Sequence, residues 1–254
     1  MILYIIVALV ILMAACWLLI SNSTLRWICG LLSTGALLVS VLLLCLNMQQ
    51  HYGMKQQTVT TKEKQIYSAG VANSPVNMLL AQRLGKSANN YVLVYRDQAK
   101  DKKPATHFMP NKKKIVSAVK KRAHYQLVAT KSTKATTQTK STYWVYKNKT
   151  MEKLFDLNNS KRILIKQRTV VKVPKDTWVI LSAQQAKSLA KKQKQTPTDP
   201  AQTKAAQQQM QQVMGMQLKQ YQQKHPKASA SDLKQYTQYL QAKMAAQQVK
   251  MMLK

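Results

Sequence analysis

Acidic residues and glycine are scarce in this chain, and each scarcity excludes a class of function. The 254 residues include eight Asp or Glu and six Gly. The carboxylates are scattered and mostly flanked by lysine, so they offer no positioned pair for general acid–base catalysis. The glycines form neither a G-x-G-x-x-G turn nor a P-loop, and no serine lies in a G-x-S-x-G elbow. We therefore expect no catalytic residue, no cofactor site and no enzymatic activity.

Metal-binding and cross-linking residues are equally sparse outside the N-terminal region. All three cysteines, Cys16, Cys29 and Cys45, lie in the first 46 residues. Residues 47–254 can therefore hold neither a disulfide framework nor a cysteine-based zinc site. The four histidines have no spacing suited to a shared metal ion. We expect no metal site.

Charge is distributed just as unevenly. Arg26 is the one charged side chain in residues 1–46, whereas residues 47–254 carry 39 basic and eight acidic residues, a formal net charge of +31. Such a charge serves solubility or attracts a polyanionic partner. Lysine outnumbers arginine 34 to six. Because lysine is a hydrated point charge, this balance favours diffuse attraction over the shaped, bidentate recognition that arginine provides.

Two apolar runs, residues 1–20 and 28–46, contain no charged side chain. A helix needs about 20 such residues to cross a hydrocarbon core of about 30 Å. With residues 21–27 as a tight connection, residues 1–47 are predicted to form an antiparallel transmembrane hairpin. Trp17, Arg26 and Trp27 lie near this connection and are expected at the membrane interface. Cys16 ends a segment that resembles a lipoprotein cleavage box, but the apolar residues after it favour an uninterrupted helix.

With two spans, both ends of the chain lie on the same side of the membrane. The distribution of basic residues indicates which side this is. Arg26 in the connection favours a cytoplasmic loop and an extracytoplasmic C-terminal region, whereas Lys55, Lys62 and Lys64 favour the reverse. Long polar domains translocate largely regardless of their charge, so the connection has more weight. We expect a two-pass cell-membrane protein with its basic region outside the cytoplasm.

Residues 48–182 are predicted to form a basic, β-rich domain. Short runs of β-branched and aromatic residues, divided by Gly, Asn, Pro and Lys, are typical of a small antiparallel sheet or barrel. These runs are 58–61, 65–67, 91–95, 125–128, 142–146, 163–165, 169–173 and 178–181. Residues 77–80 are compatible with a strand or a helical turn. Residues 158–160 and 174–176 are predicted turns, and the charged, proline-containing segment 100–114 is expected to be a mobile loop.

Residues 183–254 are rich in Lys, Gln, Ala and Met and are predicted to be helical. Asp199 and Pro200 suit the N-cap and first position of one helix, and Ser229 with Asp232 resembles the capping box of the next. Apolar residues recur at helical spacing in both, which predicts a helical hairpin packed on itself or on the sheet. The alternative is a basic amphipathic helix on an anionic membrane. The predicted fold class is thus a membrane α-helical hairpin plus an α+β water-facing region.

Clusters of basic residues are the strongest functional candidates. The best of them brackets an apolar segment, 115–119. Its members are Lys112, Lys113, Lys114, Lys120, Lys121 and Arg122. Each basic residue near an anionic surface contributes roughly 1 kcal/mol, so this cluster can hold the domain against a polyanion. The alternative is a solvated face without a partner.

Several segments resemble an uncharacterised family of two-span, basic membrane proteins of lactobacilli. The segments that carry the likeness are 51–55, 66–69, 77–80, 91–95, 144–148 and 174–178, with the basic helical tail. Members of that family have a more basic loop between the spans than the single Arg26 here. The resemblance implies the architecture and a Gram-positive envelope, and it implies no chemistry, because the family has no assigned activity.

These features favour a membrane-anchored, non-enzymatic protein whose basic domain engages anionic wall polymers or lipid headgroups. Two alternatives remain open at this point. One is a cytoplasm-facing tether for nucleic acid, although no nucleic-acid-binding signature is present. The other is a scaffold that docks another membrane protein through its tail helices.

Overall fold

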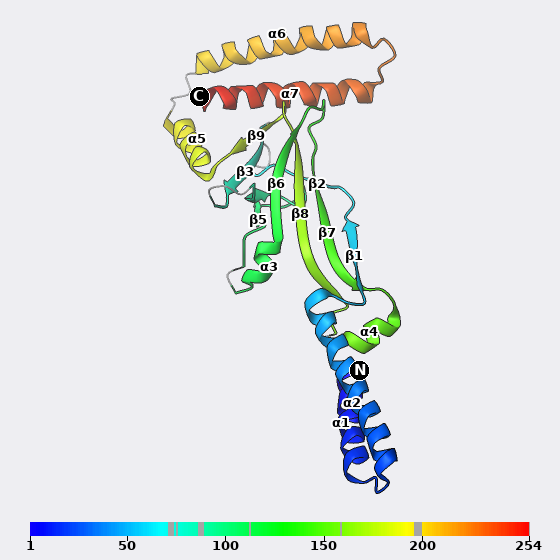
Figure 1. The fold of residues 1–254 in the computed structure, drawn as a ribbon. Coiled ribbons are helices and arrows are strands. Elements are labelled where there is room, and N and C mark those ends of the chain that lie inside the picture. Colours follow the sequence, from blue (N-terminus) through cyan, green and yellow to red (C-terminus); the bar gives the residue numbers. More distant parts are fainter. Residues whose placement is uncertain are drawn as a thin grey trace. The chain divides into compact units, whose positions relative to one another are not determined.

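The structure, a computed structural model, describes residues 1–70, 74, 76–85, 89–111, 113–157, 159–195 and 200–253. It contains an N-terminal pair of apolar helices, a mixed β-sheet region and C-terminal helices, all labelled in Figure 1. The chain divides into two compact units. Unit 1 comprises Met1–Val59 and Ser141–Gln167, and unit 2 comprises Thr60–Lys140 and Arg168–Lys254.

Unit 1 begins with helix α1 (Ile2–Leu18) and helix α2 (Ser23–Gln50), which pack as an antiparallel hairpin. Asn22 ends the connection, and its side chain accepts hydrogen bonds from the backbone N–H groups of Thr24 and Leu25. This N-cap starts α2 five residues earlier than predicted, so the expected loop at 21–27 is wrong. At the other end of α2, His51 adopts a left-handed conformation with φ of 56° and terminates the helix.

The remaining elements of unit 1 are a short helix, α4 (Lys149–Phe155), and the adjoining parts of three strands. These strands are β1 (Met54–Thr60), β7 (Ala135–Tyr146) and β8 (Arg162–Pro174). Asn148 caps α4 by accepting a hydrogen bond from the N–H of Met151 at 2.8 Å. Asn159 has a positive φ in the segment before β8, which agrees with a turn there, while Asn158 lies outside the described residues.

The strands form two sheets. One has the order β1-β7-β8-β6, with β6 at Lys121–Val128, and β2 (Lys64–Ile66) also pairs with β7. The predicted strands 163–165 and 169–173 are one continuous strand, β8, because Lys166–Arg168 between them also stay extended. The other sheet has the order β5-β4-β3-β9. Its strands are β5 (Ala105–His107), β4 (Tyr91–Tyr95), β3 (Asn77–Arg83) and β9 (Trp178–Leu181).

Two findings correct the predicted small antiparallel sheet. First, β3 pairs in parallel with β9, in the register Asn77↔Trp178 to Leu80↔Leu181, so the second sheet is mixed. The ambiguous segment 77–80 is therefore a strand. Second, the expected mobile loop 100–114 contains β5, which pairs with β4. His107 of β5 stacks on Tyr95 of β4 with ring centroids 3.9 Å apart, and this contact holds the segment in the sheet.

The core of unit 2 lies between the sheets. Its buried residues come from seven strands, β2, β3, β4, β6, β7, β8 and β9, and include Ile66, Leu79, Leu93, Val171 and Trp178. The Trp178 indole N–H donates to the carbonyl of Thr133 at 2.8 Å. The neighbouring Thr177 hydroxyl donates to the carbonyl of Ser132 at 2.8 Å. These two bonds tie the 132–133 segment to the start of β9 and leave no buried donor of either side chain unpaired.

The helical tail belongs to unit 2 and consists of α5 (Ala183–Gln195), α6 (Pro200–Lys224) and α7 (Ala230–Met252). Ser182 and Gln185 exchange reciprocal hydrogen bonds at the start of α5. Ser229 and Asp232 form the predicted capping box of α7. Pro200 is the first residue of α6 as predicted, and Asp199 lies outside the described residues.

The predicted packing of the tail is confirmed. Helices α6 and α7 run antiparallel (Figure 1), and Tyr221 stacks on Tyr236 with ring centroids 4.0 Å apart. Helix α7 buries Ala245, Ala246 and Val249 against β9 and α5. Small alanine side chains allow the helix to approach the sheet closely, so the apolar face of α7 is used within the chain.

Candidate functional site

Helix α2 is long and apolar enough to cross a membrane. It has 28 residues, and its most apolar 18-residue window has a mean hydropathy of 2.4. Only 11% of that window is buried within the chain. A core helix of a soluble protein would bury most of such a surface, because exposed apolar area costs about 25 cal/mol per Å² in water. Helix α1 is also apolar but has 17 residues, so α2 is the one described helix that meets the length for a span.

The three predicted interface residues gather where α1 meets α2. Trp17 and Trp27 contact each other edge-to-face with ring centroids 5.2 Å apart. Arg26 lies in the first turn of α2, and Trp27 is the next residue of the helix. Gly30 faces the Trp17 indole so closely that a Cβ there would lie 2.7 Å from its Cε2 atom. The helix ends on either side of the connection thus carry two aromatic rings and one cation, which is the combination that membrane–water interfaces favour.

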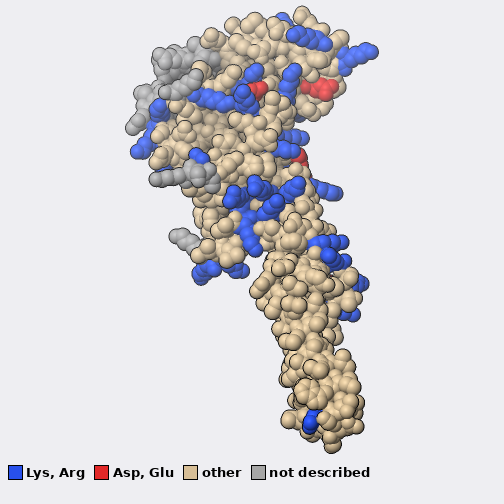
Figure 2. All heavy atoms as spheres, in the orientation of Figure 1, with Lys and Arg blue, Asp and Glu red and all other residues tan. Residues whose placement is uncertain are grey.

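The predicted basic cluster surrounds a helix that the sequence did not predict. Helix α3 (Ile115–Lys120) ends at Lys120, and Lys121 and Arg122 begin β6. Lys113 and Lys114 precede the helix, and Lys112 lies outside the described residues. Figure 2 shows Lys and Arg gathered over this part of unit 2. Among the described residues, none of the three ion pairs involves the cluster, so its charge is not neutralised within the chain.

Acidic residues have structural partners elsewhere. Glu63 pairs with Lys172, and this hydrogen-bonded lysine holds the pKa of the carboxyl below its usual range. Asp97 lies 3.3 Å from the Lys64 ammonium. The Ser229 side chain lowers the pKa of Asp232 within the capping box. In the parts of the chain that the structure describes, no three His, Cys, Asp or Glu side chains converge on a metal-sized site.

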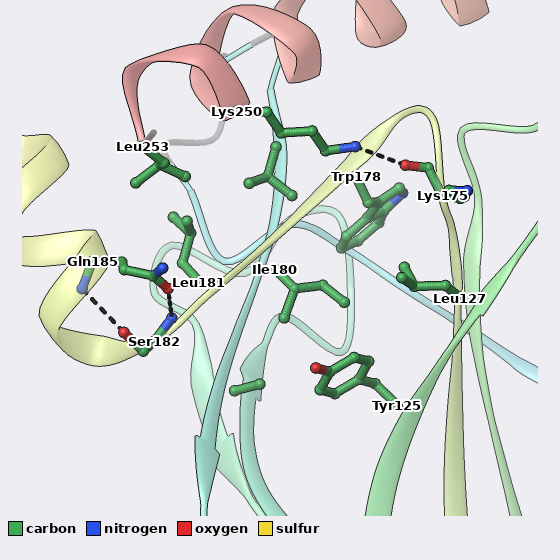
Figure 3. A pocket seen from close by; sticks show the side chains of 12 residues that line it. Tyr125, Leu127, Lys175, Trp178, Ile180, Leu181, Ser182, Gln185, Lys250 and Leu253 are labelled. Atoms are coloured by element: carbon green, nitrogen blue, oxygen red, sulfur yellow. Dashed lines mark hydrogen bonds between the residues drawn. The ribbon is translucent and has the colours of Figure 1, made fainter.

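A hollow of about 510 Å³ opens in unit 2 between β9, β6, α5 and the end of α7 (Figure 3). Tyr125, Leu127, Trp178 and Ile180 form much of its apolar wall. Lys175 and Lys250 lie at its edge, where the Lys250 ammonium donates to the Lys175 carbonyl at 2.8 Å. This arrangement can accept an apolar group with an anion at the rim.

Sequence reasoning missed this hollow. Its residues come from segments between positions 81 and 253, and no motif connects them. The sequence also missed that α3 exposes the apolar residues between the basic ones. Apolar periodicity over six residues is too short to show which side of a helix is covered.

Comparison with known proteins gives a family and no activity. The sequence model of the family described as "Domain of unknown function (DUF4811)" matches residues 22–189. This range runs from the N-cap of α2 into α5 and therefore covers the apolar helix and the sheets. No curated protein and no solved structure gave a match. Because the match covers more than half of the chain, the protein belongs to this uncharacterised DUF4811 family.

Proposed function

We propose that the protein is a membrane-anchored, non-enzymatic component of the cell envelope, whose basic surface engages anionic lipid headgroups or wall polymers. One observation carries this proposal. An apolar helix with almost no cover of its own occurs in the same chain as a cationic cluster whose described members have no acidic partner. The first feature favours a lipid surrounding and the second favours an anionic partner.

In this proposal α1 and α2 span the bilayer together. At 1.5 Å per residue, α1 is about 26 Å long and α2 is about 42 Å long. The first length falls slightly short of the hydrocarbon core, which a bilayer accommodates by thinning at modest cost. The second length allows tilt or a short extension beyond the core. The close contact of Trp17 with Gly30 favours joint insertion of the two helices.

The basic region then lies outside the cytoplasm. Arg26 at the connecting end of the hairpin supports this orientation by the positive-inside rule. The test is modification of intact cells with a lysine-directed reagent that does not cross membranes, followed by proteolysis and mass spectrometry. We expect modified lysines in α6 and α7. Modification only after cell lysis would place the region in the cytoplasm and would favour the nucleic-acid tether.

The energy available to the cluster is sufficient for a useful contact. Lys113, Lys114, Lys120, Lys121 and Arg122 are five cations, and each contributes about 1 kcal/mol at an anionic surface. Their sum, about 5 kcal/mol, is an upper limit that salt reduces. Adhesion of a domain that its own anchor already holds near the membrane needs no more than this.

The test uses the full-length chain held in nanodiscs of neutral lipid, with capture of vesicles that contain anionic lipid as the readout. A variant with all five cations changed to Gln should lose most of the capture. The matched control changes five other exposed basic residues, Lys131, Lys134, Lys140, Lys147 and Lys149, to Gln. The control should retain most of the capture, since its charges lie elsewhere. Equal capture by the parent and the first variant, or capture that moderate salt does not weaken, would refute the proposal.

The scaffold alternative has less support. The apolar face of α7 already covers β9, and Tyr221, the one aromatic residue of α6, stacks on Tyr236 of α7. These two contacts therefore use the described apolar faces of the tail within the chain.

A further inference from the structure

The α3 segment presents an apolar surface to solvent. Ile115, Val116 and Val119 are 68%, 72% and 66% exposed. Positions 115, 116 and 119 fall on one face of the six-residue helix, because residues three and four apart share a side and Val119 is four residues from Ile115 and three from Val116. Met109 in the preceding segment is also 68% exposed. Single exposed apolar residues are ordinary, but three adjacent β-branched side chains on one short helix indicate a contact surface.

The charge around this surface identifies the kind of partner. Two described lysines precede α3, and Lys120, Lys121 and Arg122 close or follow it. Residues 102–151 contain no Asp or Glu, so the apolar side chains lie in the middle of the longest acid-free stretch outside the first 62 residues. An apolar centre with a cationic border matches the boundary of a bilayer, where acyl chains lie beneath anionic headgroups. The long lysine stems can follow the apolar surface while their ammonium groups stay with the phosphates.

Other partners fit this combination less well. A hydrated wall polymer neutralises the cations but gives the apolar side chains no apolar surrounding. A second copy of the chain would bring the same cationic border against itself, which costs energy. A bilayer that contains anionic lipid satisfies both features at once.

We infer that α3 is a membrane-contacting element. Ile115, Val116 and Val119 enter the boundary between headgroups and acyl chains, while Lys113, Lys114, Lys120, Lys121 and Arg122 lie among anionic headgroups. This inference rests on the proposed function and narrows it, because it selects the lipid surface over the wall polymer and adds an apolar contribution to the electrostatic one. Salt weakens the electrostatic part, and the apolar part persists.

Insertion is tested with a thiol placed on the exposed helix. The full-length Val116→Cys chain is reconstituted in nanodiscs of neutral lipid and in nanodiscs that also contain anionic lipid, and a water-soluble maleimide is added. Labelling of the unsubstituted chain, which has Cys16, Cys29 and Cys45 in α1 and α2, gives the background. The control is Thr130→Cys, at an exposed position after β6. We expect anionic lipid to slow labelling of Val116→Cys by at least about tenfold, the factor for a 1.4 kcal/mol preference, and to leave the control nearly unchanged.

A second variant separates this inference from the proposed function. Ile115→Ser, Val116→Ser and Val119→Ser together remove the apolar surface, keep every charge and change only exposed side chains, so folding should be preserved. We expect this triple variant to capture anionic vesicles at low salt but to release them at a lower salt concentration than the parent. If the triple variant and the parent release vesicles at the same salt concentration, the inference is wrong and the proposed function stands. If the five-cation variant also binds like the parent, both are wrong. Protection of Val116→Cys that is equal in neutral and anionic discs points to an apolar protein contact, such as a second copy, and overturns the inference.

Discussion

Replacement of Trp178 tests the described core most directly, because this side chain is 2% exposed and packs in the core among residues of both sheets. Trp178→Phe keeps an aromatic ring but removes the indole N–H, so the carbonyl of Thr133 loses its donor. An orphaned buried acceptor costs about 1–3 kcal/mol. Trp178→Ala also removes the ring, and truncation of a buried aromatic residue costs about 3–5 kcal/mol. Since a domain is stable by about 5–15 kcal/mol in total, the alanine variant should be close to unfolding at ordinary temperature.

The assay is pulse proteolysis of the full-length chain in nanodiscs across a urea series, which reports the free energy of unfolding of the water-facing part. Trp27→Ala is the matched control, because Trp27 is exposed on α2 and contacts Trp17 instead of the core. We expect the order of stability to be control, Trp178→Phe and then Trp178→Ala. A cost below about 1 kcal/mol for Trp178→Ala would show that the tryptophan is not packed between the sheets and would refute the described core.

Three further predictions concern single contacts. Ser229→Ala should remove the capping box of α7 and lower stability by about 1 kcal/mol, which faster hydrogen exchange in the first turn of that helix would reveal. Burial raises the pKa of Tyr95 to about 12. The folded state therefore keeps the phenol proton that the unfolded state releases near pH 10. The free energy of unfolding should fall as the pH rises from about 10 to 12, by at most about 2.7 kcal/mol. In Tyr95→Phe this fall with pH should be smaller. Gly30→Ala should loosen the α1–α2 hairpin, because the added Cβ would meet Trp17. Gly35→Ala is the control: a Cβ there has no neighbour within 4 Å, so this variant should only gain helix propensity. The midpoint of denaturation in detergent should therefore be lower for Gly30→Ala than for Gly35→Ala. Equal midpoints would contradict the packing at Gly30.

Local signals in the sequence predicted local structure well. The Ser229–Asp232 pair forms a capping box, because such a motif needs only four consecutive residues. The β-branched runs became strands at 91–95 and 178–181. The uncharged residues of α2 indicated a membrane helix, and the absence of cover over α2 agrees with it.

Features that depend on distant residues could not be read in the same way. The parallel pairing of Asn77 with Trp178 joins two segments about a hundred residues apart. Nothing in the residue pattern of either segment shows that the other is its partner, so the sequence suggested only antiparallel neighbours. The segment around His107 is charged and proline-bounded, which is typical of a loop, but stacking on Tyr95 draws it into the sheet. The basic cluster was predicted from composition alone. The apolar residues inside the cluster are exposed because no other element covers that face of α3 in the described structure. Such an absence of tertiary contact cannot be read from the local sequence.

The parallel pair β3–β9 also bears on how the chain is made. Strand β3 obtains its partner β9 only after about a hundred more residues have been added, since Asn77 pairs with Trp178. At 5–20 residues per second, synthesis of that interval takes roughly 5 to 20 s. During this time the hydrophobic edge of β3 is open, and the core around Leu79 is incomplete. The region that emerges after the apolar helices therefore lacks a complete core, and is vulnerable to aggregation, until position 181 has been synthesised.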